Sequence, residues 1–415
     1  MMSFEVVNNI LQLKFDFLAT TTIAVLLLLL GIWLRKVVPA LTKFCIPAPV
    51  IGGFAFSILA WLLRETGMLT FKLDNMLQLP FQLLFFTAIG FGGSLALLIR
   101  GGKLFVIYIV VACWVIAILQ NVIGVALAIV TGIHPVLGVM AGAVSLEGGP
   151  ATAAAFGPVA ENLGVQGATA VAIASATYGI MVSGFLGGPL AKWLIERHKV
   201  EITTTEDKKL KEMQASMEAE KKSETITSGN VINMAVLILV MMLLGAFGSA
   251  KIKASTGFDL PAYVGAMFVA IIFRNINDVV PFIKLNHKSI DLIGDVSLGI
   301  FLTMAMMTLK IWELYSLALP LIIILVAQTV FLIAYCIFPL FQLLGRNYDA
   351  AVMCSGMIGH NLGVAPNAVA NMDAVCRRYG VVVTKAFIIV PLCGAVLIDI
   401  VGIPSIVWFI NHFAK

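Results

Sequence analysis

The chain reads Ser145-Leu-Glu-Gly-Gly-Pro-Ala-Thr152 in its first half and Gly356-Met-Ile-Gly-His-Asn-Leu-Gly-Val-Ala-Pro366 in its second. Glycine and proline interrupt helices, so each tract places irregular backbone inside a long apolar region. At membrane depth such backbone is tolerated only where protein, water or a bound ion pairs its amide and carbonyl groups. We therefore expect two broken helices, one in each half of the chain.

The composition around these tracts is that of a membrane protein. Of 415 residues, 60% are hydrophobic and only 12% are charged, and the mean hydropathy is +1.02. The net charge of +5 is dispersed through many short loops, which argues against nucleic acid as a partner and favours membrane orientation. The six cysteines lie in apolar stretches without CxxC spacing, which disfavours a disulfide framework or a metal site.

Ten apolar runs are long enough to cross about 30 Å of hydrocarbon. They lie near 18–34, 46–63, 79–99, 104–130 and 168–195, and then near 231–250, 259–273, 289–309, 314–343 and 381–410. The segments 135–162 and 349–376 are apolar but broken, and we interpret both as re-entrant hairpins. The predicted fold is an all-α polytopic membrane protein with two inverted repeats of about five transmembrane helices, each with a re-entrant hairpin.

Basic residues predict the orientation of these spans. An N-terminus outside the cell places most short-loop arginines and lysines inside, as the positive-inside rule requires. The predicted parts are an N-terminal repeat over 1–196, a cytoplasmic polar linker over 197–229 and a C-terminal inverted repeat over 230–415. Within the linker, Leu210, Met213 and Met217 have helical spacing, which fits either a surface helix or a partly helical solvated segment.

Landmarks recur between the two halves at a nearly constant offset of about 210 residues. Pro49 and Pro261 each stand at the start of an apolar span, Gln120 corresponds to Gln328, and Gly148 corresponds to Gly359. An odd number of spans in each repeat inverts the second copy. Broken segments at matching places in inverted repeats are typical of secondary transporters, whose binding sites lie near the bilayer midplane.

Longer stretches carry a resemblance to a known family. They are Ile46-Pro-Ala-Pro-Val-Ile-Gly-Gly53, Val296-Ser-Leu298, Lys310-Ile-Trp-Glu-Leu-Tyr-Ser-Leu-Ala-Leu-Pro320, Tyr348-Asp-Ala-Ala-Val352 and Gly363-Val-Ala-Pro-Asn-Ala-Val-Ala-Asn-Met372. Through them the chain resembles the bacterial glutamate:sodium symporters over nearly its whole length. The resemblance implies sodium-coupled uptake of L-glutamate, no enzymatic activity, no cofactor besides sodium as coupling ion, a bacterial inner membrane location, and a homodimer working as an elevator in the lipid bilayer.

The hairpins supply the candidate site. Helix N-termini at the breaks can face the substrate carboxylates, and neutral polar side chains can add donors and acceptors. The candidate substrate contacts are Ser145, Glu147, Gly148, Gly149, Thr152, Gly359, His360, Asn361, Gly363 and Asn367. The candidate sodium ligands are Asp295, Ser297, Asn371 and Asp399, since ionisable groups inside a membrane are costly and mark functional sites.

Several alternatives stay open at this point. The first tract reads Glu147-Gly-Gly-Pro-Ala151 where the family has a Ser-Gly-Gly-His-Gly type of sequence, so the cargo could be another amino acid or a dicarboxylate. Glu147 or His360 could couple protons instead of sodium. Glycine-rich loops also build channel filters. Asp295 and Asp349 resemble the paired acids of an intramembrane aspartyl protease, although the surrounding motif does not fit.

Overall fold

The computed structural model describes the chain except for residues 1, 8–9, 44–45, 96–101, 205–223 and 415. The predicted linker helix with Leu210, Met213 and Met217 therefore lies outside the described residues. The elements of the first half are β1 (Met2–Val7), β2 (Ile10–Phe15), α1 (Phe17–Val37), α2 (Pro39–Lys43), α3 (Ala48–Glu65), β3 (Leu69–Leu73), α4 (Gln78–Gly90), α6 (Gly102–Ile107), the π-helix η1 (Tyr108–Trp114), α7 (Val115–Val130), α8 (Pro135–Met140), α9 (Ala143–Leu146), α10 (Gly149–Asn162) and α11 (Ala168–Arg197).

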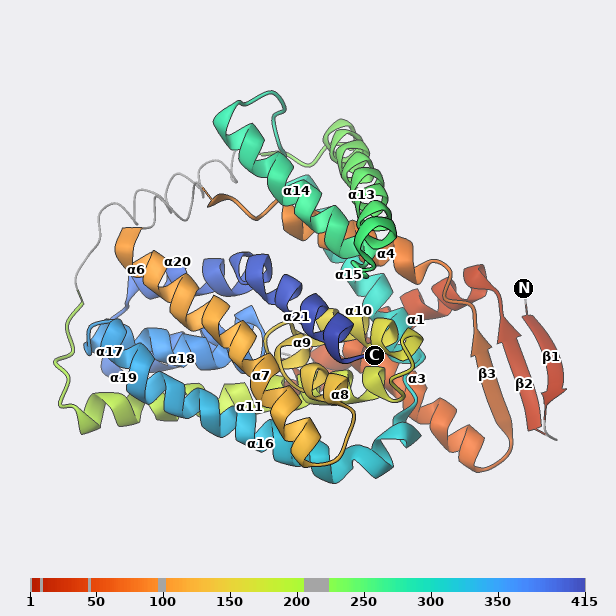
Figure 1. Cartoon of the computed structure of the whole chain (residues 1–415), viewed down its shortest axis with the longest axis horizontal. Coiled ribbons are helices and arrows are strands. Elements are labelled where there is room, and N and C mark those ends of the chain that lie inside the picture. The colour runs from red at the N-terminus through yellow and green to blue at the C-terminus, as the bar shows by residue number, and fades with distance from the viewer. Residues whose placement is uncertain (1, 8–9, 44–45, 96–101, 205–223, 415) are drawn as a thin grey trace.

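The second half begins after the linker (Figure 1). Its elements are α13 (Ser228–Thr256), α14 (Ala262–Val279), α15 (His287–Met307), the 3-10 helix η2 (Ile311–Leu317), α16 (Ala318–Tyr335), the π-helix η3 (Cys336–Leu340), α17 (Phe341–Leu343), α18 (Tyr348–Leu362), α19 (Ala365–Tyr379), α20 (Thr384–Leu392), the π-helix η4 (Cys393–Leu397) and α21 (Asp399–Phe413).

Nine helices in the described part of the chain are long and apolar enough to cross a membrane. They are Phe17–Val37, Ala48–Glu65, Gly102–Val130, Ala168–Arg197, Ser228–Thr256, Ala262–Val279, His287–Met307, Ala318–Leu343 and Thr384–Phe413. Leucine, isoleucine and valine dominate these segments, and in lipid a helix pairs all its backbone groups internally. The prediction of a multi-pass, mainly helical membrane protein is confirmed.

The predicted span near 79–99 is wrong in its extent. Helix α4 ends at Gly90, where the backbone turns through Phe91, Gly92 and Gly93. Gly90 also packs closely on α14, because a Cβ there would lie 2.5 Å from the carbonyl oxygen of Met267. The helix therefore ends in a glycine-rich turn that packs against α14, although the sequence beyond it is still apolar.

A three-stranded sheet near the N-terminus is an addition to the helical fold that the sequence did not predict. Strand β1 pairs antiparallel with β2, and β2 pairs parallel with β3. The ring of Phe71 in β3 packs against Phe15 in β2 and Phe56 in α3, with centroids 6.2 Å and 5.1 Å apart. The sheet therefore joins the segment before α1 to the segment after α3, at one end of the molecule (Figure 1).

Two groups of helices make up the rest of the molecule. The outer group comprises α1, α3, α4, α13, α14 and α15, with α1 packed on α3, α13 on α14, and α15 on α3 and α4. Small residues allow these close approaches: Gly52 meets the backbone of α1, and Gly245 meets the backbone of α14 at Ala266. Two smaller clusters of apolar side chains in this group lie apart from the main core.

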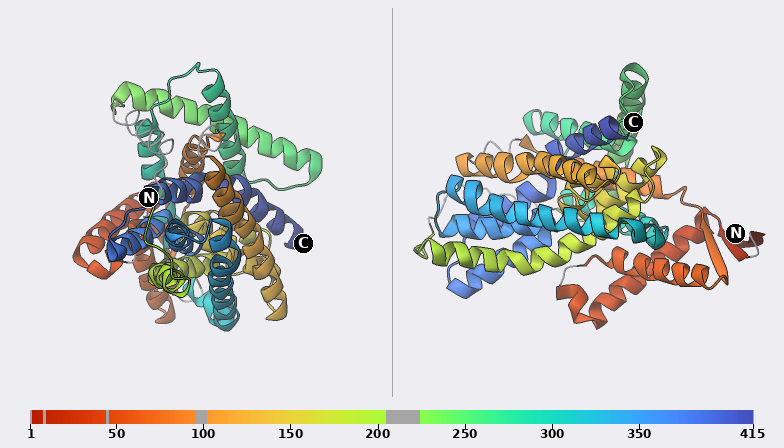
Figure 2. Two further views of the ribbon diagram at one scale, coloured as in Figure 1. Left: turned by 90° about the vertical axis from the view of Figure 1, so that its left-hand side faces the viewer. Right: turned by 60° about the horizontal axis from the view of Figure 1, so that its bottom comes forward.

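The inner group comprises α6 to α11 and α16 to α21 with their π-helical segments. It contains most of the largest buried cluster of apolar side chains. Helix α11, yellow-green in Figure 2, packs on α9, α10, α18 and α19, so it contacts both broken tracts. This helix places the two tracts against each other.

Candidate functional site

The first tract breaks its helix twice. Helix α8 ends at Met140, the short α9 follows, and α10 begins at Gly149. Gly149 has a φ of +65°, a left-handed conformation that favours glycine. Pro150 then fits the first turn of α10, where its missing N–H costs nothing. A new helix N-terminus therefore forms here, as the sequence predicts.

The second tract breaks later than the sequence predicts. Helix α18 runs through Gly359, His360 and Asn361 to Leu362, and the chain turns at Gly363 and Val364 before α19 begins. Gly359 lies in the crossing of α18 and α19, and a methyl group there would overlap the backbone of Ala368. The break therefore lies at Gly363 and not at Gly359, because Gly359 permits close helix packing instead of ending the helix.

The two breaks meet. A Cβ built on Gly149 would lie 3.1 Å from Cγ1 of Val364 and 3.7 Å from the carbonyl oxygen of Gly363. In the described chain, neither α10 nor α19 has a side chain that caps its N-terminus. By contrast, Asn347 caps α18 and Asn286 caps α15. Two uncapped, partly positive helix ends, one from each half of the sequence, thus converge at one point.

Helix α11 holds the second break through buried polar contacts. Asn367 donates from Nδ2 to the carbonyl oxygen of Ile180 at 2.8 Å and to Oγ of Ser183 at 2.7 Å. Asn371 donates to the carbonyl oxygens of Ser183 at 3.0 Å and Ser355 at 3.3 Å. These bonds fix the start of α19 against α11. Ser183 is a site residue that the sequence did not single out.

Five buried amide side chains of the inner group share one pattern. Each amide nitrogen donates to a backbone or hydroxyl oxygen. Each amide oxygen, in contrast, has no hydrogen-bond partner among the described residues. The five are Gln120, Asn121, Gln328, Asn361 and Asn367. Unpaired acceptors in a buried region are costly, and an ordered water or a cation can satisfy them.

Gln120 and Gln328 join the two halves directly. Gln328 donates from Nε2 to the carbonyl oxygen of Gln120 at 2.7 Å, and Gln120 donates to the carbonyl oxygen of Asn361 at 2.9 Å. Asn361 in turn donates to the carbonyl oxygen of Ala112 at 2.7 Å. Asn121 was missed in the sequence, although it stands beside Gln120 in the same apolar run and carries the same signal.

His360 faces the π-helix η1. Its Nε2 lies 2.8 Å from the hydroxyl oxygen of Tyr108, and both side chains are fully buried. Gly394 leaves room for the ring, because a Cβ there would lie 2.7 Å from its Cγ. The structure thus places His360 in a packed contact with η1 and η4, whereas Gly149 and Gly363 form the meeting point of the breaks.

The two hydroxyl candidates of the first tract have local partners. Ser145 donates to the carbonyl oxygens of Met140 and, at 2.7 Å, Ala172. Thr152 is buried in the first turn of α10, where its side chain fills the space beside Gly148. Both side chains therefore support the shape of the first tract and its packing against α11.

The candidate sodium ligands are not all together. Asp295 and Ser297 lie on α15 of the outer group, Asp295 with an exposed side chain and Ser297 with a buried one. Asn371 lies on α19 and Asp399 at the start of α21, both in the inner group. Asp399 lies one helical turn before Gly402, and a Cβ built on Gly402 would lie 2.8 Å from Oε1 of Glu147.

The acids of the protease alternative have other partners. Asp349 forms an ion pair with Lys385 and accepts a hydrogen bond from Oγ1 of Thr204 at 2.7 Å. Asp295 lies on α15, which packs mainly against α1, α3 and α4. The two carboxyl groups belong to different helix groups, so they do not form a catalytic pair sharing a proton.

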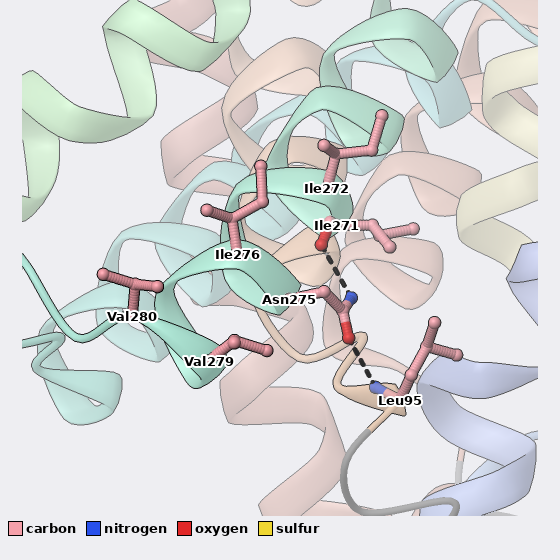
Figure 3. A pocket seen from close by; sticks show the side chains of 7 residues that line it. All are labelled: Leu95, Ile271, Ile272, Asn275, Ile276, Val279 and Val280. Carbon is pink, nitrogen blue, oxygen red and sulfur yellow. Dashed lines mark hydrogen bonds between the residues drawn. The ribbon is translucent and has the colours of Figure 1, made fainter.

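An apolar pocket lies elsewhere, beside α14. It encloses about 480 Å³ and is lined by Leu95, Ile271, Ile272, Asn275, Ile276, Val279 and Val280. Figure 3 shows its one polar side chain, Asn275, engaged with the backbone of Ile271 and Leu95. The pocket contains no residue of either tract. In the described residues there is also no cluster of three histidine, cysteine, aspartate or glutamate side chains that could hold a metal.

The comparison with protein families decides the class. Residues 13–381 match the family described as sodium/glutamate symporter. The chain belongs to the sodium/glutamate symporter family. The resemblance seen in the sequence is thereby confirmed, and since this is a family of transporters the chain is not an enzyme.

Curated relatives carry the same description. The chain is 39% identical to the sodium/glutamate symporter of Haemophilus influenzae over 92% of its own length and 94% of that protein. It is 38% identical to the sodium/glutamate symporter of Escherichia coli over 93% and 95% of the two chains. Among solved structures it is similar to a sodium proton antiporter of Methanocaldococcus jannaschii, with 16% identity, a TM-score of 0.45 and coverage of 96% and 97%.

Proposed function

We propose that this symporter family member carries L-glutamate into the cell together with sodium, and that the substrate binds where α10 and α19 begin. One observation carries the proposal: two uncapped helix N-termini converge at Gly149 and Val364. Free amide groups and a partly positive helix end bind carboxylates well. Gly148, Gly149, Gly363 and Asn367 are the substrate contacts that this geometry supports best.

Sodium coupling is supported by the unpaired oxygens around that point. Gln120, Gln328 and Asn361 supply neutral acceptors in a buried region, and sodium is a hard cation that prefers oxygen ligands. Coupling also has a thermodynamic role, because an inside-negative membrane opposes the entry of an anion. Each sodium ion contributes about 2.3 kcal/mol per 100 mV and about 1.4 kcal/mol per tenfold concentration gradient.

The division into two helix groups supports an elevator mechanism with inverted repeats. The outer group takes α1, α3 and α4 from the first half and α13, α14 and α15 from the second. The inner group takes the broken tracts and the remaining spans of both halves. Each repeat would thus give three helices to a fixed scaffold and the rest to a moving transport domain.

The remaining features of the proposal rest on the sequence and on the family resemblance. We infer a homodimer joined through the scaffold, in a bacterial inner membrane, with both termini outside and the polar linker 197–229 in the cytoplasm. The parts are an N-terminal repeat over 1–196 and an inverted repeat over 230–415, with re-entrant hairpins near 135–162 and 349–376. The arginine and lysine distribution supports this orientation.

The decisive experiment is uptake of labelled L-glutamate into liposomes that contain the purified protein. An inward sodium gradient is compared with an equal potassium gradient and with an imposed pH gradient. Accumulation that requires the sodium gradient is the expected result. Uptake driven by a pH gradient without sodium would refute sodium coupling, and uptake of a competing amino acid or dicarboxylate in place of glutamate would refute the substrate.

A further inference from the structure

Glu147 is a partly buried acid that the substrate site does not use. It follows α9, two residues before the start of α10, yet its carboxylate turns toward α21. A Cβ built on Gly402 would lie 2.8 Å from Oε1 of Glu147 and 3.8 Å from Cβ of Ala117. The absence of a side chain at Gly402 therefore makes the room that this carboxylate occupies between α7 and α21.

The surroundings of Glu147 are acidic and rich in acceptors. Asp399 begins α21, one helical turn before Gly402, the residue beside which the Glu147 carboxylate lies. Oε2 of Glu147 is buried and has no hydrogen-bond partner in the described part of the chain. Two carboxylates inside a membrane are costly unless a proton or a metal cation offsets their charge, because each loses its hydration and repels the other.

A second, independent feature of the same interface points to a cation. Asn121 lies one turn beyond Ala117 on α7, and its Nδ2 donates to Oγ of Ser405 on α21 at 3.1 Å. Asn121 is fully buried, and its Oδ1 is another acceptor for which the described residues offer no donor. The α7 to α21 interface thus carries unpaired oxygens in two successive helical turns.

We propose that Glu147, Asp399 and Asn121 form a sodium site between α7, α9 and α21, separate from the amide cluster around Gln120. Sodium fits better than a shared proton, because a proton bridges one pair of oxygens whereas a sodium ion coordinates several oxygens. Glu147 is then a ligand of the coupling ion, and its negative charge does not repel the substrate. The inference rests on sodium-coupled transport and specifies where one of the ions binds.

The test uses the full-length purified protein and measures its thermal stability against sodium concentration, with potassium keeping ionic strength constant. Glu147→Gln and Asp399→Asn should each raise the sodium concentration for half-maximal stabilisation by about tenfold or more, equivalent to the loss of a strong ligand. Asp373→Asn is the matched control, since that acid forms an exposed ion pair with Arg377 on α19. It should leave the sodium dependence unchanged.

Gly402→Ala provides a variant that keeps every carboxylate. Its methyl group takes the space beside Oε1 of Glu147, so sodium should bind several-fold more weakly while the protein remains folded in size-exclusion chromatography. Unchanged sodium dependence in Glu147→Gln and Gly402→Ala would overturn the proposal. The proposal would also be overturned if these variants changed only the pH dependence of stability and left its sodium dependence unchanged, because Glu147 and Asp399 would then share a proton.

The same variants separate this inference from the transport proposal. If the wild-type protein takes up no glutamate but Glu147→Gln still weakens sodium binding, the ion site stands and the substrate is wrong. If wild-type uptake requires sodium and Glu147→Gln leaves both sodium binding and uptake unchanged, transport stands and this ion site is wrong.

Discussion

At the scale of single residues, Gly149 combines a special backbone conformation with a close contact. Its φ of +65° costs a residue with a side chain about 1–2 kcal/mol. Its position beside Val364 adds a steric demand at the point where the two breaks meet. The backbone and the contact can be separated experimentally.

We predict that Gly149→Ala lowers glutamate uptake by about tenfold or more, because the added methyl group displaces one helix N-terminus from the other by a fraction of an ångström. Uptake into proteoliposomes measures the effect. Gly132→Ala is the control, since Gly132 has a φ of +74° and no atom near its Cβ position. Equal losses of uptake in the two variants would show that backbone strain alone is responsible.

A second residue prediction concerns the ion pair of Asp349 and Lys385, whose side chains are 4% and 13% exposed. Asp349→Asn should destabilise the protein by about 3–5 kcal/mol, because it leaves the lysine buried and unpaired. Asp373→Asn breaks the exposed pair with Arg377 and should cost no more than about 1 kcal/mol. Thermal melting in detergent compares them, and similar melting temperatures would contradict the burial argument.

The sequence predicts residue roles unevenly. A glycine at a helix break can be predicted from sequence, because few other residues adopt a positive φ, and Gly149 has such a conformation. The direction of a side chain is not readable, since it depends on which helix lies opposite. His360 and Ser145 were both expected at the substrate, and the structure turns one toward Tyr108 and the other toward α11.

At the scale of elements, the crossing of α18 and α19 depends on Gly359. A methyl group there overlaps the backbone of Ala368, so the two helices must move apart. We predict that Gly359→Ala costs about 1–3 kcal/mol of stability, seen as a lower melting temperature in detergent.

The matched control for this crossing is Gly184→Ala on α11. Gly184 also lies within a helix, but nothing approaches its Cβ position within 4 Å. Alanine is the better helix former, so this variant should be neutral or slightly stabilising. Equal destabilisation of both variants would mean that helix propensity, and not the crossing, sets the cost.

Element prediction succeeded where hydrophobic length decides the outcome. Spans such as Phe17–Val37 and Ala168–Arg197 were readable because lipid demands about 20 apolar residues. The strands β1 to β3 were missed, because they are short and depend on pairing between segments that are distant in the sequence. The end of α4 was missed because a tertiary contact of Gly90 with α14 fixes it.

At the scale of the whole molecule, the proposed elevator requires the inner group to slide past the outer group. The rings of Phe156 on α10 and Tyr263 on α14 meet across this boundary, with centroids 5.4 Å apart. Phe156→Cys with Tyr263→Cys, joined by a short thiol cross-linker, should abolish uptake, and reversal of the cross-link should restore it. The two single variants, treated identically, are the controls. Full uptake with the cross-link intact would exclude sliding at this boundary.

The arrangement of the two halves was only partly readable. Matching landmarks such as Gln120 and Gln328 indicated a repeat, and the structure brings these two side chains into one hydrogen-bonded chain. Which spans pack together was not readable, because lipid-facing and protein-facing helices have similar apolar compositions. The separation of α13 and α14 from α7 and α11 is a property of packing alone.

The small sheet has a consequence for biosynthesis. Strand β2 precedes α1 and β3 follows α3, so pairing of the two requires both strands to be in the same aqueous compartment. Because β3 is synthesised after α1 and α3, the sheet can close only once Leu73 has left the ribosome. The N-terminal tail must therefore reach its final side of the bilayer before the sheet forms. A reporter fused to the tail then also shows on which side of the bilayer the α3 to α4 connection lies.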